Sequence, residues 1–161
     1  MKKLLFSLLL FGIVLSSNAQ KFSENALGLR LGSNDGVGYE ISYQRGLEKT
    51  NRIEADLGWR NSNNVSSFKL VGLYQWIWEL DKGFNWYAGV GGGFGSWNYN
   101  FDGVSSSGTV LLVAGDVGVE YNFDIPLQVS LDFRPEMYFN SSAYRNSSFG
   151  PDIALSVRYR F

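Results

Sequence analysis

The residues of this chain that could do chemistry are charged side chains that recur at every second position along several stretches. Asp116 and Glu120 are candidates for catalysis, because paired carboxylates can act as general acid and general base on a glycosidic bond. The sequence contains no histidine and no cysteine. Histidine-based triads, cysteine nucleophiles, disulfides and metal sites built from thiolates or imidazoles are therefore excluded.

A second candidate is the glycine-rich run from Gly89 to Gly95. Glycine-rich loops hold phosphate when they have G-x-G-x-x-G spacing and lead into a helix. This run lacks both the spacing and a following helix. The sequence instead predicts a strand whose glycines leave room for large neighbours and allow sharp curvature.

The elements that position the charged residues are strands, because apolar residues alternate with polar ones at a period of two. Leu27, Leu29 and Leu31, for example, alternate with Gly28 and Arg30. The fourth segment is apolar at nearly every position, so its facing stays open. The eight predicted segments cover residues 27–32, 37–44, 52–60, 67–78, 86–95, 111–121, 127–137 and 152–161.

The connections between these segments alternate in length. Those after the second, fourth and sixth segments are short, whereas residues 61–66, 96–108 and 140–149 form longer stretches rich in Asn, Ser and Gly. Eight segments near the length of a membrane-spanning strand, with short turns on one side and longer loops on the other, are typical of outer-membrane barrels. The sequence therefore predicts an all-β fold, an eight-stranded antiparallel up-and-down transmembrane β-barrel. Pro135 lies in the seventh segment, and we expect it at a bulge near the rim because proline donates no hydrogen bond to a sheet.

The charged face is expected to point into the barrel, because an Arg or Lys at the bilayer midplane costs about 2–4 kcal/mol. Charges of both signs in a narrow lumen must pair with one another, which explains them without catalysis. Aromatic residues near both ends of the segments fit two interfacial belts. The predicted lumenal set is Arg30, Glu40, Arg52, Glu54, Asp56, Arg60, Asp116, Glu120, Asp132, Arg134, Glu136, Arg158 and Arg160.

The N-terminus has the three parts of a signal peptide. Lys2 and Lys3 precede a short apolar run, and small residues lead to an expected cleavage after Ala19. The alternative is a membrane anchor, but the run is shorter than the roughly 20 residues that a spanning helix needs. We therefore expect residues 1–19 to be a cleaved leader and residues 20–161 to be the barrel domain.

Composition excludes two further classes of protein. A chain with 45% hydrophobic residues is not a disordered tail. A net charge of −1 lacks the basic surplus that binding to nucleic acid requires.

The last nine residues, Ile153–Phe161, resemble the C-terminal strand that the outer-membrane barrel assembly machinery recognises, with Tyr159 and Phe161 as the signal. The stretches 72–76, 85–95 and 131–135 are similar to those of small outer-membrane barrels of the OmpA-like and OmpX-like superfamily. The resemblance implies insertion by that machinery, contact with outer-membrane lipids, and no cofactor. It does not imply one activity. The related barrel enzymes use a catalytic histidine, which this chain lacks.

These observations predict a barrel plugged by side chains, without metal or catalytic role, that acts as a structural or surface-interaction protein. Its partner would be an extracellular ligand bound through residues 61–66, 96–108 and 140–149. One alternative is a narrow channel or a conduit for hydrophobic ligands along the glycine-lined fifth segment. The other is a secreted, lipocalin-like carrier with an apolar interior.

Overall fold

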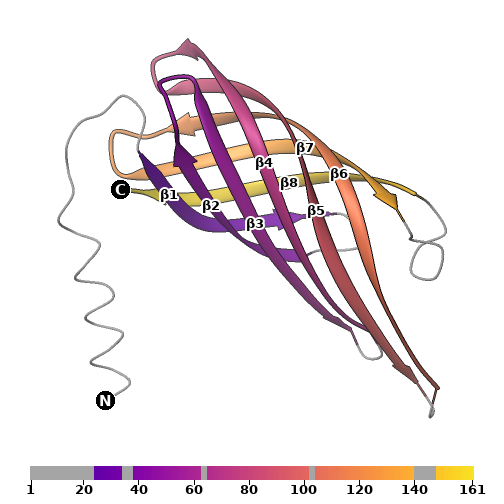
Figure 1. The fold of residues 1–161 in the computed structure, drawn as a ribbon. Coiled ribbons are helices and arrows are strands. Elements are labelled where there is room, and N and C mark those ends of the chain that lie inside the picture. The colour runs from indigo at the N-terminus through magenta and orange to yellow at the C-terminus, as the bar shows by residue number, and fades with distance from the viewer. Residues whose placement is uncertain (1–23, 34–37, 63–64, 102–103, 140–147) are drawn as a thin grey trace, which may run out of the picture.

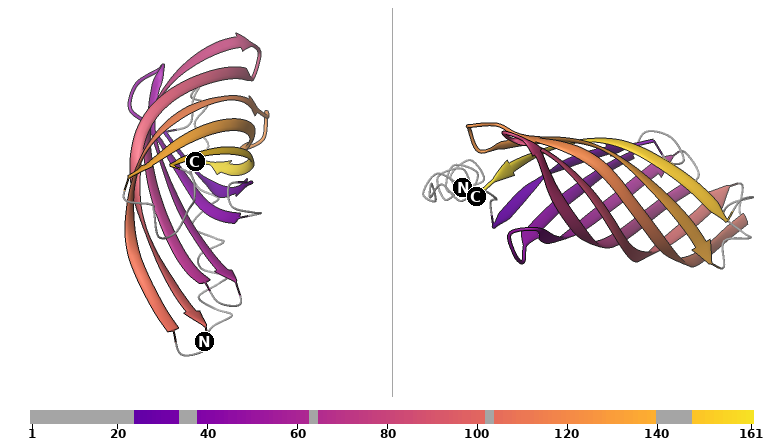
Figure 2. Two further views of the ribbon diagram at one scale, coloured as in Figure 1. Left: turned by 90° about the vertical axis from the view of Figure 1, so that its right-hand side faces the viewer. Right: turned by 90° about the horizontal axis from the view of Figure 1, so that it is seen from above.

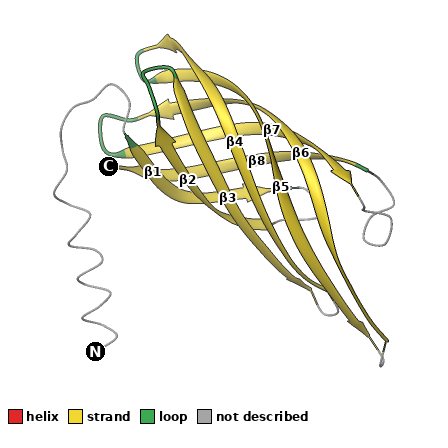
Figure 3. Ribbon diagram, in the orientation of Figure 1, coloured by secondary structure: helices red, strands yellow, loops and turns green. Residues whose placement is uncertain are grey.

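The computed structural model describes residues 24–33, 38–62, 65–101, 104–139 and 148–161, so the expected leader and its cleavage point lie outside the described residues. Each strand pairs antiparallel with the next, and the first pairs with the last, which closes an eight-stranded barrel (Figures 1 and 3). The predicted fold class is confirmed. In the described parts of the chain, no helix is long and apolar enough to cross a membrane. The strands are β1 (Asn25–Gly32), β2 (Gly38–Gly46), β3 (Asn51–Ser62), β4 (Val65–Asp81), β5 (Phe84–Phe101), β6 (Val104–Asn122), β7 (Leu127–Phe139) and β8 (Phe149–Arg160).

The alternation in sequence becomes an alternation between lumen and outer surface, because successive side chains of a strand point to opposite faces. Leu29 is 54% exposed on the outside, whereas its neighbour Arg30 is 1% exposed inside. The same geometry settles the facing of β4, in which Val71, Leu73 and Gln75 are buried in the lumen.

Three short turns lie at one end of the barrel, here called the turn end. They comprise residues 47–50, 82–83 and 123–126, as the sequence predicts. Gly83 has φ of 77°, in the left-handed region that favours glycine. The opposite end, where the longer predicted connections lie, is called the loop end.

The strands from β4 to β6 are much longer than the other five and extend the barrel on one side (Figures 1 and 2). The expectations that residues 61–66 and 96–108 form loops are wrong. Residues 61–62 end β3 and residues 65–66 begin β4, and they pair with one another in register. Residues 96–101 continue β5 and residues 104–108 continue β6, and the two are paired in register to Phe101 and Val104. The apolar alternation stops before the ladder does, because backbone hydrogen bonding does not require an apolar outer face.

Glycines in β5 allow it to lie unusually close to β4. A Cβ at Gly91 would lie 1.9 Å from the carbonyl oxygen of Gly72, and one at Gly93 would lie 2.2 Å from that of Leu70. Gly91 and Gly93 therefore allow the two backbones to approach closely. As predicted, a β5 glycine also leaves room for a large neighbour, since a Cβ at Gly89 would lie 2.8 Å from Cγ of Gln75. The same holds in β6, where a Cβ at Gly118 would lie 2.5 Å from the Tyr87 ring.

Pro135 lies within β7, opposite Pro151 of β8, so its expected place at a rim bulge is wrong. The β6–β7 register passes from Ala114 directly to Val117, which leaves Gly115 and Asp116 out of the ladder. Proline is accommodated because the ladder is interrupted at the residue that lacks a donor.

Candidate functional site

The barrel lumen holds most of the charged residues predicted from the sequence. Apart from Arg60, the predicted lumenal set has twelve residues, and eleven of these are buried. They are Arg30, Glu40, Arg52, Glu54, Asp56, Asp116, Glu120, Asp132, Arg134, Glu136 and Arg158. They come from six strands and meet across the lumen, so sequence neighbours are seldom partners.

Arg30 and Arg134 form the centre of one cluster toward the loop end. Arg30 forms ion pairs with Glu40 at 2.8 Å and Asp152 at 2.7 Å, and also with Asp132. Arg134, with no exposed surface, pairs with four carboxylates. Its guanidinium nitrogens lie 2.7 Å from Asp56, 2.9 Å from Glu40, 2.9 Å from Glu136 and 3.3 Å from Asp152. The shared carboxylates join both arginines into one network.

Arg158 and Arg52 form a second cluster toward the turn end. Arg158 pairs with Glu54 at 3.0 Å and donates hydrogen bonds to the hydroxyls of Ser42 and Ser130. Arg52 pairs with Glu120 at 2.5 Å. Its guanidinium also lies 4.7 Å from the centre of the Tyr87 ring, within range of a cation–π interaction.

Arg160 is not part of the buried network. It is half-buried at the turn end and donates hydrogen bonds to the carbonyl oxygens of Phe123 and Ile125. Its position explains the difference, because it is two residues closer to the rim than Arg158. Arg160 therefore holds the turn between β6 and β7. The ring of Tyr159 stacks with that of Phe161, with centroids 6.3 Å apart.

Several residues that the structure places in the network are absent from the lumenal set derived from the sequence, among them Asp152, Lys69 and Gln75. Asp152 contacts both central arginines, Lys69 lies 2.9 Å from Glu136, and Gln75 donates to Asp116 and Glu54. Asp152 occupies an inward position of an alternating strand, so the pattern itself could have identified it. Lys69 and Gln75 lie in β4, whose facing the sequence left open.

Asp116 and Glu120 do not form a catalytic pair. They lie on one strand four residues apart, which is about 13 Å along an extended chain. Glycosidases place their two carboxyl groups no more than about 9.5 Å apart. Across the described part of the chain, no three acidic residues converge in an arrangement that could hold a metal ion.

Part of the lumen is apolar, which the prediction of a polar plug did not include. These side chains come from β4, β6 and β7, and both β4 and β6 carry apolar residues on their two faces here. The cluster consists of Val71, Leu73, Val110, Leu112, Ala114 and Tyr138.

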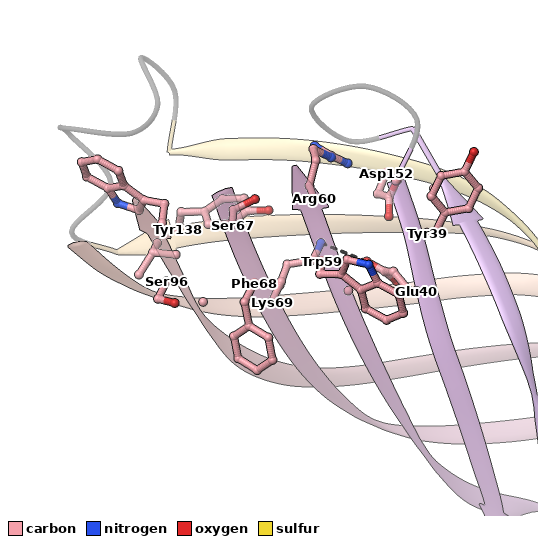
Figure 4. A pocket seen from close by; sticks show the side chains of 16 residues that line it. Tyr39, Glu40, Trp59, Arg60, Ser67, Phe68, Lys69, Ser96, Tyr138 and Asp152 are labelled. Atoms are coloured by element: carbon pink, nitrogen blue, oxygen red, sulfur yellow. Dashed lines mark ion pairs between the residues drawn. The ribbon is translucent and has the colours of Figure 1, made fainter. Parts of the chain in front are cut away.

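A small cavity of about 60 Å³ lies at the loop end, lined by residues from all eight strands (Figure 4). Its floor includes Glu40, Lys69 and Asp152, which belong to the arginine network. Arg60, half-buried, lies at its mouth, where its guanidinium packs against Gly38. A second cavity of about 30 Å³ at the turn end shares no lining residue with the first. The charge network lies between the two.

Comparison with solved structures identifies the fold. The N-terminal β-barrel domain of Pseudomonas aeruginosa OprF matches with a TM-score of 0.69 at 11% identity, over 87% of this chain and 98% of that one. A de novo designed transmembrane β-barrel matches with a TM-score of 0.60 at 17% identity, over 89% and 100%. The chain has the fold of a small transmembrane β-barrel. Ail, the attachment invasion locus protein of Yersinia pestis, matches with a TM-score of 0.57 at 14% identity, over 86% and 97%. No protein-family model and no curated protein sequence matches the chain.

In this fold the outer face of the barrel contacts lipid. The side chains exposed on that face have the distribution expected of a lipid-facing surface. Trp78 and Trp86 stack at the turn end with centroids 4.3 Å apart, as expected of an interfacial aromatic belt. Toward the loop end the apolar outer face of β5 and β6 ends at Phe94 and Leu111. Beyond these residues, the outward positions carry only polar side chains.

Proposed function

We propose that this protein is an exported outer-membrane barrel, closed by its own side chains, that binds an extracellular partner through its loop end. The observation that carries the proposal is the extension of β5 and β6 beyond the lipid-facing surface. We name residues 96–101 and 104–110 the ribbon. In this orientation the ribbon stands outside the membrane, because outer-membrane barrels have short periplasmic turns and longer extracellular connections.

The ribbon has the composition of a contact surface. Its exposed side chains are uncharged and polar, and the half-buried Tyr99 adds an aromatic group. Tyr supplies rigid contact area, and Ser, Gly and Asn supply adaptable hydrogen bonds, as in antibody loops. The outward polar positions are Ser96, Asn98, Asn100, Ser105, Ser107 and Thr109.

The lumen supports a structural role for the charge network. An eight-stranded barrel has an interior only wide enough for side chains. Here those side chains are paired, and the cavities at the two ends are separate. A channel would have to separate these pairs, and a carrier with an apolar interior does not fit the buried charges.

The fold neighbours support an extracellular partner for a barrel of this size. Ail of Yersinia pestis has also been crystallised with the heparin analogue sucrose octasulfate. For this chain we propose an extracellular protein or polysaccharide as the partner, with outer-membrane lipids around the barrel. We further propose cleavage after Ala19 and insertion by the barrel assembly machinery through the strand that ends at Phe161.

The proposal is tested with a variant in which the ribbon is shortened. Replacing residues 97–108 with Asn-Gly joins Ser96 to Thr109, which already face each other, through a two-residue hairpin turn. Lys82→Asn, which creates Asn-Gly at the opposite end, is the matched control. Cells that display each form are tested for adhesion to immobilised extracellular proteins and sulfated polysaccharides.

We expect the shortened protein to insert normally and lose adhesion, while the control keeps it. Unchanged adhesion of the shortened protein would exclude the ribbon as the contact surface. A steady, large conductance of the intact protein in planar bilayers would favour the channel instead.

A further inference from the structure

A hollow of about 420 Å³ lies on the outer face of the barrel, across β2, β3, β4 and β5, which are side by side in Figure 1. Its volume is within the range of ligand-binding pockets, about 300–1,000 Å³. It forms where the outward residues are smallest, because Ala55 of β3 pairs with Gly72 of β4. A Cβ at Gly72 would meet no atom closer than 4.0 Å, so the floor of the hollow is open. The outward residues that line the hollow are Tyr43, Ile53, Ala55, Gly72, Tyr74 and Val90.

The hollow offers an apolar surface to the membrane. Ile53 is 42% exposed and Val90 is 56% exposed on this face. Glu54 also borders the hollow, but its side chain is buried in the lumen and pairs with Arg158 at 3.0 Å. Its carboxylate is therefore not offered to a ligand on the outer face, and the group that fills the hollow is apolar.

One end of the hollow carries a cation, Arg45. In the ladder between β2 and β3, Arg45 is opposite Ile53, and Ile53 is in turn opposite Tyr74 of β4. Directly opposite residues on one face have Cβ atoms about 4.5–5.5 Å apart, so Arg45 adjoins the lining of the hollow. Arg45 is exposed and forms no ion pair with any described residue. Its charge is therefore available to a ligand.

The row from Arg45 to Tyr74 runs obliquely across the membrane-facing wall. Arg45 is one residue from the end of β2 at Gly46, whereas Tyr74 is seven residues from the end of β4 at Asp81. Both strand ends lie at the turn end of the barrel. Because strands of membrane barrels are tilted, a row of paired residues climbs from the middle of the wall to the rim. A ligand in the hollow thus has its apolar part deep in the membrane and its polar part at Arg45.

We infer that the hollow binds an acyl chain of a glycerophospholipid whose phosphate is held by Arg45. An arginine guanidinium can donate two parallel hydrogen bonds to a phosphate. Asn25 lies opposite Arg45 and accepts a hydrogen bond from the Tyr43 hydroxyl at 2.6 Å through its Oδ1. The amide nitrogen of Asn25 is then left to donate to the same phosphate.

The ligand belongs to the periplasmic leaflet, because short turns of outer-membrane barrels face the periplasm. This inference rests on the proposed orientation of the barrel and not on its surface role. A second copy of the chain is the other occupant to consider. Two copies that met at this face would bring two Arg45 side chains to one interface, and the outward residues of β2 and β3 include no carboxylate to pair with them. A lipid phosphate supplies the missing negative charge.

The probe is phosphatidylglycerol that carries a photoreactive diazirine in one acyl chain. It is added at low mole fraction to phosphatidylcholine vesicles that contain the intact protein, and labelled residues are mapped by mass spectrometry after irradiation. Diacylglycerol with the same diazirine chain is the control without phosphate. We expect phosphatidylglycerol to label the outward residues of β3 and β4 about fivefold more than those of β7 and β8. This is the effect of one basic side chain on an anionic lipid, so diacylglycerol should label both regions alike.

Two variants test the polar and apolar parts of the site separately. Arg45→Gln should abolish the fivefold enrichment, whereas Lys82→Gln, which removes an exposed cation in the turn between β4 and β5, should keep it. Gly72→Phe fills the hollow and should also abolish the enrichment. Val157→Phe places the same side chain on the lipid-facing side of β8, where Val157 is 46% exposed, and should not. The gel-mobility shift on boiling confirms that each variant is folded.

Enrichment at β3 and β4 that depends on phosphate, Arg45 and an unfilled hollow supports a phospholipid site. Even labelling around the barrel, or unchanged enrichment in Arg45→Gln, overturns it, since either result shows ordinary lipid contact only. Cross-linking of two copies through this face, with exclusion of the probe, overturns it in favour of a dimer. If shortening the ribbon abolishes adhesion while labelling is even, the surface role stands and the lipid site fails. If adhesion survives shortening while the enrichment is found, the surface role fails instead.

Discussion

Replacing Arg134 with methionine is the most direct perturbation of the lumenal network. The guanidinium is fully buried and pairs with Asp56, Glu40, Asp152 and Glu136. Three of these carboxylates keep another cation, because Glu40 and Asp152 also contact Arg30, and Glu136 contacts Lys69. Among the described residues, Asp56 has Arg134 as its one ion-pair partner. The cost therefore falls mainly on one buried carboxylate.

Removing one partner of a buried ion pair costs about 3–5 kcal/mol, because the remaining charge is uncompensated. We expect Arg134→Met to lower the free energy of unfolding by about this amount. Adding Asp56→Asn removes that charge and should recover about 2–3 kcal/mol, near the upper end of measured pairwise couplings. Asp56→Asn alone leaves Arg134 with three carboxylates and should cost less than Arg134→Met.

The measurement is urea unfolding in phospholipid vesicles, followed by tryptophan fluorescence. The four proteins form a double-mutant cycle, which isolates the coupling between the two residues. A cost below about 1 kcal/mol for Arg134→Met, or additive effects in the double variant, would show that Asp56 does not depend on Arg134.

Three further predictions test other parts of the molecule. Gly91→Val should block folding, because its Cβ would lie 1.9 Å from the Gly72 carbonyl oxygen. The control Gly72→Ala should fold normally, because its Cβ meets nothing closer than 4.0 Å. Folding of both variants is measured by the shift in gel mobility between unheated and boiled samples. Val117→Arg should destabilise the barrel by about 2–4 kcal/mol because Val117 is 45% exposed to lipid, and equal or greater loss of stability in Asp116→Asn by urea titration would contradict the facing. Deletion of Phe161 should reduce the amount of protein in the outer membrane, measured by immunoblot, and normal levels would count against its role in assembly.

The facing of most strands could be predicted because charge is so costly in lipid. Wherever a strand carried charged residues on one face, as with Arg52, Glu54 and Asp56, only one orientation was tenable. That argument fails for β4, in which Lys69 is the only charge between Val65 and Trp78. The part of the apolar lumen that β4 supplies, Val71 and Leu73, escaped prediction for the same reason.

The length of the ribbon could not be predicted because two different physical causes act on one strand. Apolar alternation reflects lipid, and it ends at Phe94 and Leu111. The pairing of β5 with β6 continues to Phe101 and Val104. Polar residues such as Ser and Asn resemble a loop in sequence, although here they occupy paired strands.

The ion pairs within the lumen could not be predicted from the sequence either. The alternating pattern predicts that Arg30 and Asp132 both point inward, but it does not predict that they contact each other. They belong to β1 and β7, which are not neighbours in the sheet. Their contact depends on the strand register, which sets the position of each residue along the barrel axis. It also depends on the closure of the barrel, which brings strands that are not neighbours in the sheet close together across the lumen.

The cost of breaking this network also limits what the lumen can do. A conducting state would have to separate buried pairs such as Arg134 and Asp56, and the same 3–5 kcal/mol applies to that separation. A gap of this size leaves the open state at about 1% or less of molecules. Recordings in planar bilayers should therefore show rare, brief openings in the intact protein, and more frequent ones in the combined Arg134→Met and Asp56→Asn variant. Steady conductance in the intact protein would mean that the network does not close the lumen. With the lumen closed, the polar groups that we propose for a partner are those on the outer face of the ribbon.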